Sequence, residues 1–254
     1  MGKYFTVEVK PTIPNVAAGQ HTQFAADDLL FDWFAFDIPK GTSRLINATI
    51  EIRPKLDSGA TVNECDLDLV FGKTVNGEPP RTLGTSNSAL GADRNLSNHM
   101  VAYIARTAWG AFEQHLDSTS FTMLSDDGTS RFNIHHLLFT GEPDSGTNVG
   151  YDRFYVAGIA HDTFDFRSEI QINNGTLDGD IFTVDGVDPT LGLAAGDVIA
   201  ATATADTSVS KSLGTVKSLA TNRIVLEATT ETAVVNNDFI YNTTPIRITL
   251  HFEK

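Results

Sequence analysis

The chain has 254 residues, 41% of them hydrophobic, a length that allows one large β domain or two smaller ones. Its 18 basic and 32 acidic residues give a net charge of −14, and the sequence contains no basic run. Because nucleic acids and anionic membranes are bound mainly through Lys and Arg, we expect neither as a partner.

Cys65 is the single cysteine, so no intramolecular disulfide and no thiolate metal cluster can form. Residues 1–10 alternate apolar and polar side chains and lack the basic and apolar regions of a secretion signal. No stretch approaches the ~20 apolar residues that a membrane-spanning helix needs. These features predict a chain that folds in a reducing cytoplasm.

Apolar residues recur with a period of two over much of the chain, which is typical of half-buried β-strands. Phe5, Val7 and Val9 share one face of a first strand. The stretch 30–38 is apolar almost throughout, which predicts a strand buried on both faces or one end of an interface.

Residues 39–42, Pro-Lys-Gly-Thr, have the composition of a tight turn. We expect this turn to join 30–38 and 44–53 into a hairpin. In 44–53, one face of the predicted strand carries Ile46, Ala48, Ile50 and Ile52.

The middle of the chain predicts further strands at 67–71, 121–123, 132–140 and 154–158. Residues 77–98 are rich in Pro, Gly, Ser and Asn and predict a long exposed loop, which we consider a candidate contact. The spacing in 98–116 fits either a helix or a strand, and both interpretations stay open.

The composition changes near Ser168, because aromatic residues become scarce and Thr, Ala, Gly and Asp take over. Five short strands are expected before residue 243, including a hairpin of 214–219 with 223–226, and this spacing suggests a small barrel. Residues 245–253 then return to bulky alternation, with Ile246, Ile248, Leu250 and Phe252 on one face.

The sequence therefore predicts an all-β fold. We expect an antiparallel β-sandwich, jelly-roll-like, formed by 1–167 plus 244–254. A second small β-barrel domain, 168–243, would be inserted before the last strand.

Two clusters deserve testing as metal sites, although we expect no metal and no cofactor. His135 and His136 are neighbours in a predicted strand, where they would point to opposite faces and could not share one ion. A second cluster could offer carboxylate oxygens to Ca²⁺, but its spacing differs from that of an EF-hand, and Asp-Gly pairs are chiefly turn formers; its members are Asp178, Asp180, Asp185 and Asp188.

The sequence lacks a GxSxG elbow, a phosphate-binding GxxxxGK[ST] loop and a GxGxxG motif. We therefore expect no catalytic residues and predict that the protein is not an enzyme. Aromatic and apolar side chains of the first two strands are instead candidate partner contacts, with core packing as the alternative; they are Tyr4, Phe5, Val7, Val9, Trp33, Phe34 and Phe36.

The opening of the chain resembles virion structural proteins of tailed phages, in particular those of marine cyanobacteria. The resemblance is carried by residues 4–10 (YFTVEVK), 29–33 (LLFDW) and 36–45 (FDIPKGTSRL), and it extends over residues 1–55 and the strand around 153–166. Segment 168–243 is similar to small β-barrel insertions of phage structural proteins.

The resemblance implies a capsid decoration, or cement, protein on a virion assembled in the host bacterial cytoplasm. Its partners would be the major capsid protein or other virion proteins, and a homo-oligomer, a trimer above others, would match the lattice axes. Alternatives are a tail, baseplate or fibre component, a jelly-roll coat protein, a carbohydrate-binding module for host attachment, and a glycan-degrading enzyme.

Overall fold

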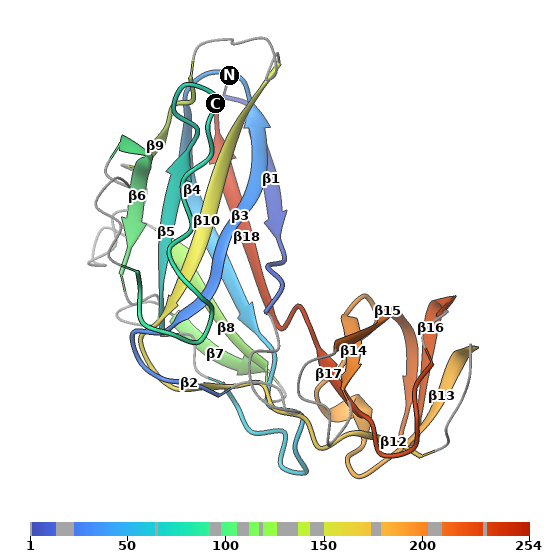
Figure 1. Cartoon of the computed structure of the whole chain (residues 1–254). Helices are drawn as coiled ribbons and strands as arrows, with labels where there is room; N and C mark the ends of the chain where they lie inside the picture. The colour runs from blue at the N-terminus through green and yellow to red at the C-terminus, as the bar shows by residue number, and fades with distance from the viewer. Residues whose placement is uncertain are drawn as a thin grey trace.

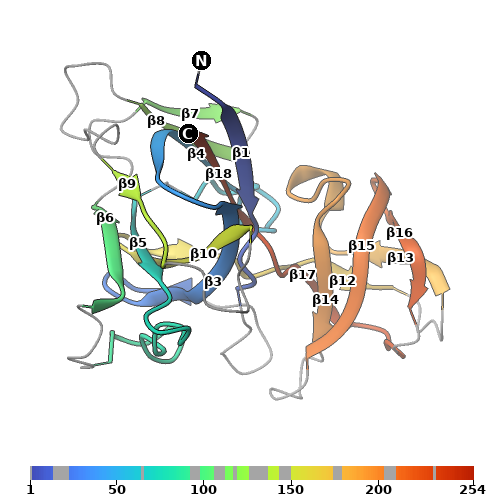
Figure 2. The same ribbon diagram turned by 90° about the horizontal axis from the view of Figure 1, so that it is seen from above.

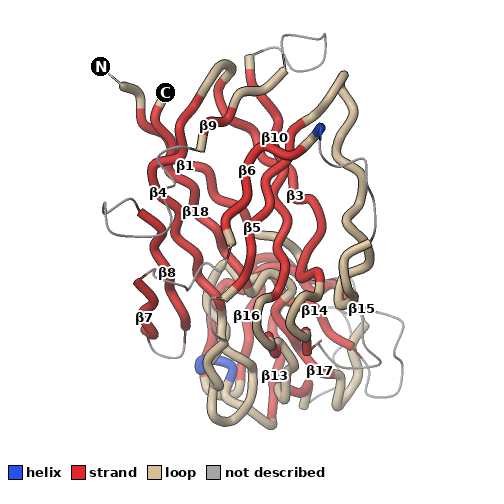
Figure 3. The backbone as a smooth tube through the Cα atoms, turned by 90° about the vertical axis from the view of Figure 1, so that its left-hand side faces the viewer, coloured by secondary structure: helices blue, strands red, loops and turns tan. Residues whose placement is uncertain are grey.

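The computed structural model describes residues 2–13, 23–63, 66–91, 98–105, 112–116, 119–125, 137–142, 150–173, 179–202, 210–230 and 233–254. Within these ranges the fold is all-β, as predicted, and it contains no α-helix; Pro189–Leu191 forms a short 3-10 helix, η3. Figure 3 shows that strands account for most of the described backbone.

Two antiparallel sheets make up the larger part of the molecule (Figure 1). The first is a curled sheet in the order β1 (Tyr4–Val9), β18 (Ile246–Glu253), β4 (Ser43–Ile52), β8 (Thr119–Ser125), β7 (Phe112–Leu116), with β9 (Leu138–Phe139) also paired to β4. The second has the order β3 (Leu29–Pro39), β10 (Tyr151–Ala160), β5 (Leu67–Lys73), β6 (Met100–Ile104). A short pair, β2 (Gln23–Phe24) and β11 (Phe164–Asp165), lies outside both sheets.

The remaining strands form a closed antiparallel barrel beside the two sheets (Figure 2). Around the barrel they follow the order β12 (Gln171–Ile172), β13 (Gly179–Asp185), β16 (Arg223–Thr230), β15 (Ser210–Ala220), β14 (Val198–Thr202), β17 (Phe239–Asn242). The small barrel and the β15–β16 hairpin are thus confirmed, with Ala220 opposite Arg223 across a two-residue turn. The two-residue strand β12 carries too short a pattern to be found from the sequence.

The two sheets enclose one apolar core, to which the central strands β4, β18, β5 and β10 contribute buried apolar side chains. Ile246, Ile248, Leu250 and Phe252 are all fully buried, which confirms the predicted face of the last strand. Phe139 of β9 lies at the centre of an aromatic cluster, with ring centroids 5.2–5.3 Å from those of Phe71, Phe154 and Phe252. Edge-to-face pairs of this kind add stability beyond the area they bury.

The predicted hairpin over 39–42 is wrong. β3 pairs with β10, and β4 pairs with β18, β8 and β9, so the turn carries the chain from one sheet to the other. Asp152 of β10 holds this crossing, because its carboxylate accepts from the Gly41 N–H at 3.0 Å and lies 2.9 Å from Lys40 Nζ. Turn composition indicates a reversal of the chain, but it does not indicate whether the two strands share a sheet.

The structure corrects two further expectations, one about a strand face and one about a helix. The sequence predicts Ile46 on the same buried face as Ala48. In the structure the pairing of β4 with β18 shifts in register between His251 and Phe252, and Leu45 instead of Ile46 is fully buried. A β-bulge of this kind changes the face on which side chains lie. In 98–116, the described parts are the strands β6 and β7, so the helical interpretation is wrong there.

Candidate interaction surface

β1 forms one end of the first sheet, and its outer edge pairs with no other strand in the described part of the chain. Lys3 and Lys254 exchange backbone hydrogen bonds of 3.3 and 2.9 Å. Hydrogen-bonded and non-hydrogen-bonded pairs alternate along an antiparallel ladder. The backbone N–H and C=O groups of Tyr4, Thr6 and Glu8 consequently point away from β18.

The side chains of β1 divide cleanly between the core and the outer surface. Val9 is fully buried, Phe5 and Val7 are half-buried against the core, and Phe5 stacks on Phe252 at 5.3 Å. Tyr4 is 68% exposed, and its hydroxyl donates to Glu253 Oε1 at 3.2 Å. Of the candidate contacts on this strand, Tyr4 offers the most surface.

A surface groove of about 520 Å³ opens where β1 begins and β3 ends; its lining residues are Lys3, Tyr4, Phe5, Pro39 and Lys254. Pro39 ends a strand of the second sheet, so the groove lies between the edges of the two sheets. Lys254 Nζ donates to the backbone carbonyl of Lys40, which holds this side chain at the groove. Figure 1 places the start of β1 and the end of β18 at the end of the sheets farthest from the barrel.

The candidate contacts on β3 lie in two different environments. Phe36 is buried and Phe34 is half-buried, and both belong to the same core as Phe5, Val7 and Val9. Trp33 packs on the other side of the sheet with Leu83, and its Nε1 donates to the Arg81 carbonyl at 2.7 Å. The structure therefore does not assemble the seven candidates into one exposed patch.

The loop that follows β5 lies along β3 rather than projecting from the molecule. The Leu29 N–H donates to the Ser88 carbonyl at 3.0 Å, and the Asn87 N–H donates to the Leu29 carbonyl at 2.9 Å. Asp32 accepts from the Leu83 N–H at 3.1 Å. Residues 77–91 of the predicted contact loop 77–98 thus cover the start of β3, whereas no described segment covers β1 in this way.

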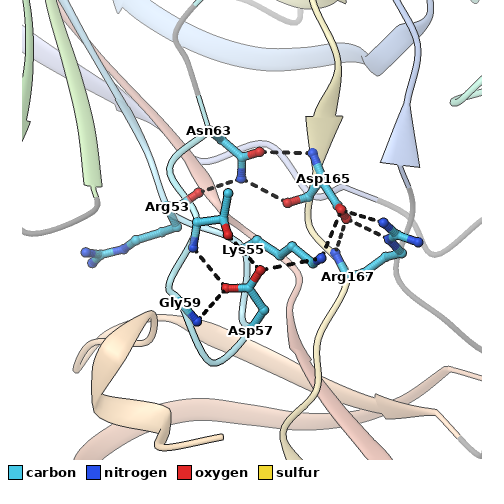
Figure 4. A network of polar contacts seen from close by, with 8 residues as sticks. Arg53, Lys55, Asp57, Gly59, Asn63, Asp165 and Arg167 are labelled. Carbon is cyan, nitrogen blue, oxygen red and sulfur yellow. Dashed lines mark hydrogen bonds and ion pairs between the residues drawn. The ribbon is translucent and has the colours of Figure 1, made fainter.

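A polar network connects the segment that leads to the barrel with the loop after β4 (Figure 4). Asn63 donates to the carbonyls of Arg53 and Asp165, both at 3.0 Å, and accepts from the Asp165 N–H at 2.9 Å. Arg167 binds the Asp165 carboxylate through two contacts, of 2.9 and 2.7 Å. Burial alone would raise the pKa of Asp165, but the hydrogen bonds from Arg167 and the charge of Lys55 hold that pKa below its ordinary value.

Two side chains from the loop after β4 reach the barrel itself. Leu56 is 4% exposed and belongs to the core cluster of the barrel rather than to that of the two sheets. Arg53 lies 3.4 Å from Asp197 and 3.3 Å from Glu51. Burial raises the pKa of Asp197, although the nearby Arg53 guanidinium opposes this shift. The sequence gives no local signal for these contacts, because their partners are far apart along the chain.

A buried carboxylate on the outer side of the second sheet was also missed from the sequence. Asp68 is 5% exposed, accepts from the Tyr103 hydroxyl and lies 3.0 Å from His161 Nε2. Burial and the hydrogen bond to Asp68 raise the pKa of Tyr103. A charged residue within the apolar run 67–71 is the signal that indicates a paired buried group.

The described residues contain no group of three or more His, Cys, Asp or Glu side chains placed to hold a metal ion. Asp188 instead caps η3, because its carboxylate accepts from the N–H and hydroxyl of Thr190 at 2.9 and 2.7 Å. His135, His136, Cys65 and Asp178 lie outside the described residues.

Comparison with known proteins finds no family model, no curated protein and no solved structure that matches this chain. Within the described ranges, no helix is long and apolar enough to cross a membrane.

Proposed function

We propose that this chain is a non-enzymatic structural protein of a phage virion, and that it works as a capsid decoration protein. The observation that carries the proposal is the outer edge of β1, where the backbone groups of Tyr4, Thr6 and Glu8 pair with no strand in the described part of the chain and lie beside an open groove. An edge strand is a template for pairing with another chain, and proteins that assemble use it in this way. The resemblance of the first strands to phage virion proteins supports the same role.

The strand order supports a jelly-roll-like sandwich for 1–167 plus 244–254. Without β7 and β9, the two sheets contain eight strands, which can be renumbered 1 to 8 along the chain; they are β1, β3, β4, β5, β6, β8, β10 and β18. In this numbering the order is 1-8-3-6 in one sheet and 2-7-4-5 in the other. Jelly rolls occur in viral capsid proteins and in lectins. The barrel strands all fall between β10 and β18, which supports 168–243 as an inserted domain.

The partner in this proposal is the major capsid protein or another virion protein, and the protein acts as a homo-oligomer, with a trimer favoured by lattice symmetry. Repetition over a shell allows contacts that are individually weak to add up through avidity. Fold alone does not decide function, so the proposal needs a test on particles.

The test is quantitative mass spectrometry of density-purified virus particles from the source of this sequence, together with light scattering of the purified protein. We expect a copy number that is a simple fraction of the number of coat subunits. Absence from intact particles would overturn the proposal. A few copies per particle would instead indicate a tail component, and binding on a glycan array would indicate a host-attachment module.

A further inference from the structure

The edge of β1 has both the length and the geometry to accept one more strand. Phe5, Val7 and Val9 use their backbone groups for β18, so the outward groups of Tyr4, Thr6 and Glu8 recur at every second residue. An incoming extended segment would find alternating donors and acceptors along the whole of β1.

The two strands at this edge, with their flanking residues, carry a net positive charge, although the chain as a whole is acidic. Residues 2–10 and 246–254 carry four basic and two acidic side chains, whereas the complete chain has 18 and 32. At the groove, Lys3 and Lys254 line the opening next to Tyr4 and Phe5. Glu8, farther along β1, is already balanced by Arg247 at 2.9 Å and Lys10 at 3.2 Å.

We infer that β1 binds an extended acidic segment of a partner protein, which adds to the sheet as a new edge strand and fills the groove. The inference rests on the proposed assembly function and specifies the chemistry of the partner. Opposite charge guides the segment to the correct end of the edge, while backbone hydrogen bonds and apolar burial hold it there.

The geometry also determines the pattern of the segment. Lys3, whose backbone pairs with Lys254 just before β1, is two residues from Phe5, so the two side chains lie on the same side of the sheet, and both line the groove. Side chains at every second position of the added strand lie on that side as well. The segment therefore carries an apolar residue that packs against Phe5 and Pro39, and, two positions away, an Asp or Glu that faces Lys3.

The test is selection of binders from a random peptide display library on the immobilised full-length protein, followed by affinity measurement with synthetic versions of the enriched peptides. Thr6→Pro removes an outward N–H and places a ring on the edge, and edge positions with an outward N–H are where a strand tolerates Pro. Thr6→Val is the matched control, because it also loses the 3.2 Å contact to His251 but keeps the N–H.

We expect the enriched peptides to carry an acidic residue two positions away from an apolar one. These peptides should bind Thr6→Pro about tenfold more weakly than Thr6→Val. Lys3→Glu should weaken binding of the same peptides, whereas Lys217→Glu on the exposed barrel surface should not. Circular dichroism and thermal unfolding check that each variant folds. If Thr6→Pro does not fold, Tyr4→Pro provides a second variant of the same edge.

Three results would overturn the inference. These are an absence of peptides that discriminate Thr6→Pro from Thr6→Val, enrichment of basic peptides, and a dimer of the natural protein that Thr6→Pro dissociates. The last result would assign the edge to a second copy of this chain. If the protein is abundant on particles but its peptide binding fails these criteria, the assembly function stands and the assignment of β1 is wrong.

Discussion

Leu56 is the residue through which the two-sheet part and the barrel part can be tested as one cooperative unit. It lies in the loop after β4, yet its side chain is 4% exposed within the barrel core. The fit is tight, because a Cβ added to Gly192 would lie 2.4 Å from Leu56 Cδ2. Truncation to Ala removes buried carbon atoms from a site whose neighbours are held by the barrel strands.

We expect Leu56→Ala to lower the free energy of unfolding by about 3 kcal/mol, from a range of roughly 2–5 kcal/mol for buried Leu→Ala changes. Equilibrium unfolding in guanidinium chloride measures this loss. Hydrogen exchange should locate it in the barrel amides, although the mutated residue lies outside the barrel strands.

Leu191→Ala is the matched control, because it makes the same chemical change at a side chain that is 44% exposed. Its effect should stay within about 0.5 kcal/mol. The reasoning is refuted if the two variants lose equal stability, or if Leu56→Ala leaves the exchange of the barrel amides unchanged.

Three further predictions use other features of the fold. Gly158→Ala should destabilise the protein by about 2 kcal/mol or more in the same unfolding assay, because the new Cβ would lie 2.2 Å from Phe31 Cε1, and an unchanged midpoint would contradict this packing. Lys211→Met should lower the free energy of unfolding by about 3 kcal/mol, because it removes the cation that lies 2.7 Å from the Asp238 carboxylate, which is 1% exposed. Lys217→Met should lower it little. Asp165→Asn should destabilise the protein most at neutral pH. Folding lowers the pKa of the Asp165 carboxyl, so the charged carboxylate stabilises the fold at pH values above its unfolded pKa near 3.8, and this contribution is lost at more acidic pH. A difference in stability between the two proteins that does not shrink below pH 3.8 would refute the assignment.

The strands and their apolar faces could be predicted from the sequence because both depend on local alternation. Residues 246–253 show this best, with the four predicted core side chains fully buried. The barrel was predicted for a related reason, since regularly spaced short strands with turn residues between them are typical of closed small sheets. Gly214, whose φ is +118°, lies at the shift in register between β14 and β15, a local detail that the spacing of the strands does not predict.

What could not be predicted depends on contacts between distant parts of the chain. The turn at 39–42 has the composition of a hairpin, but β3 finds its partner in β10, more than a hundred residues later. The aromatic run of β3 predicted either a core or a surface, and the structure divides it between a core side and a side covered by 77–91. The groove beside β1 likewise arises from residues at opposite ends of the sequence.

The position of the barrel between β10 and β18 has a mechanical consequence. β10 lies between β3 and β5, and β18 lies between β1 and β4, so both connections of the barrel lead into the interior of a sheet. A force that pulls the barrel along these strands would act on the hydrogen-bond ladders on both sides of β10 and on both sides of β18 at the same time. These hydrogen bonds run perpendicular to the strands and would resist the force in shear. Such an arrangement transmits force from an attached object into the body of the protein without separating the ladder bonds one at a time.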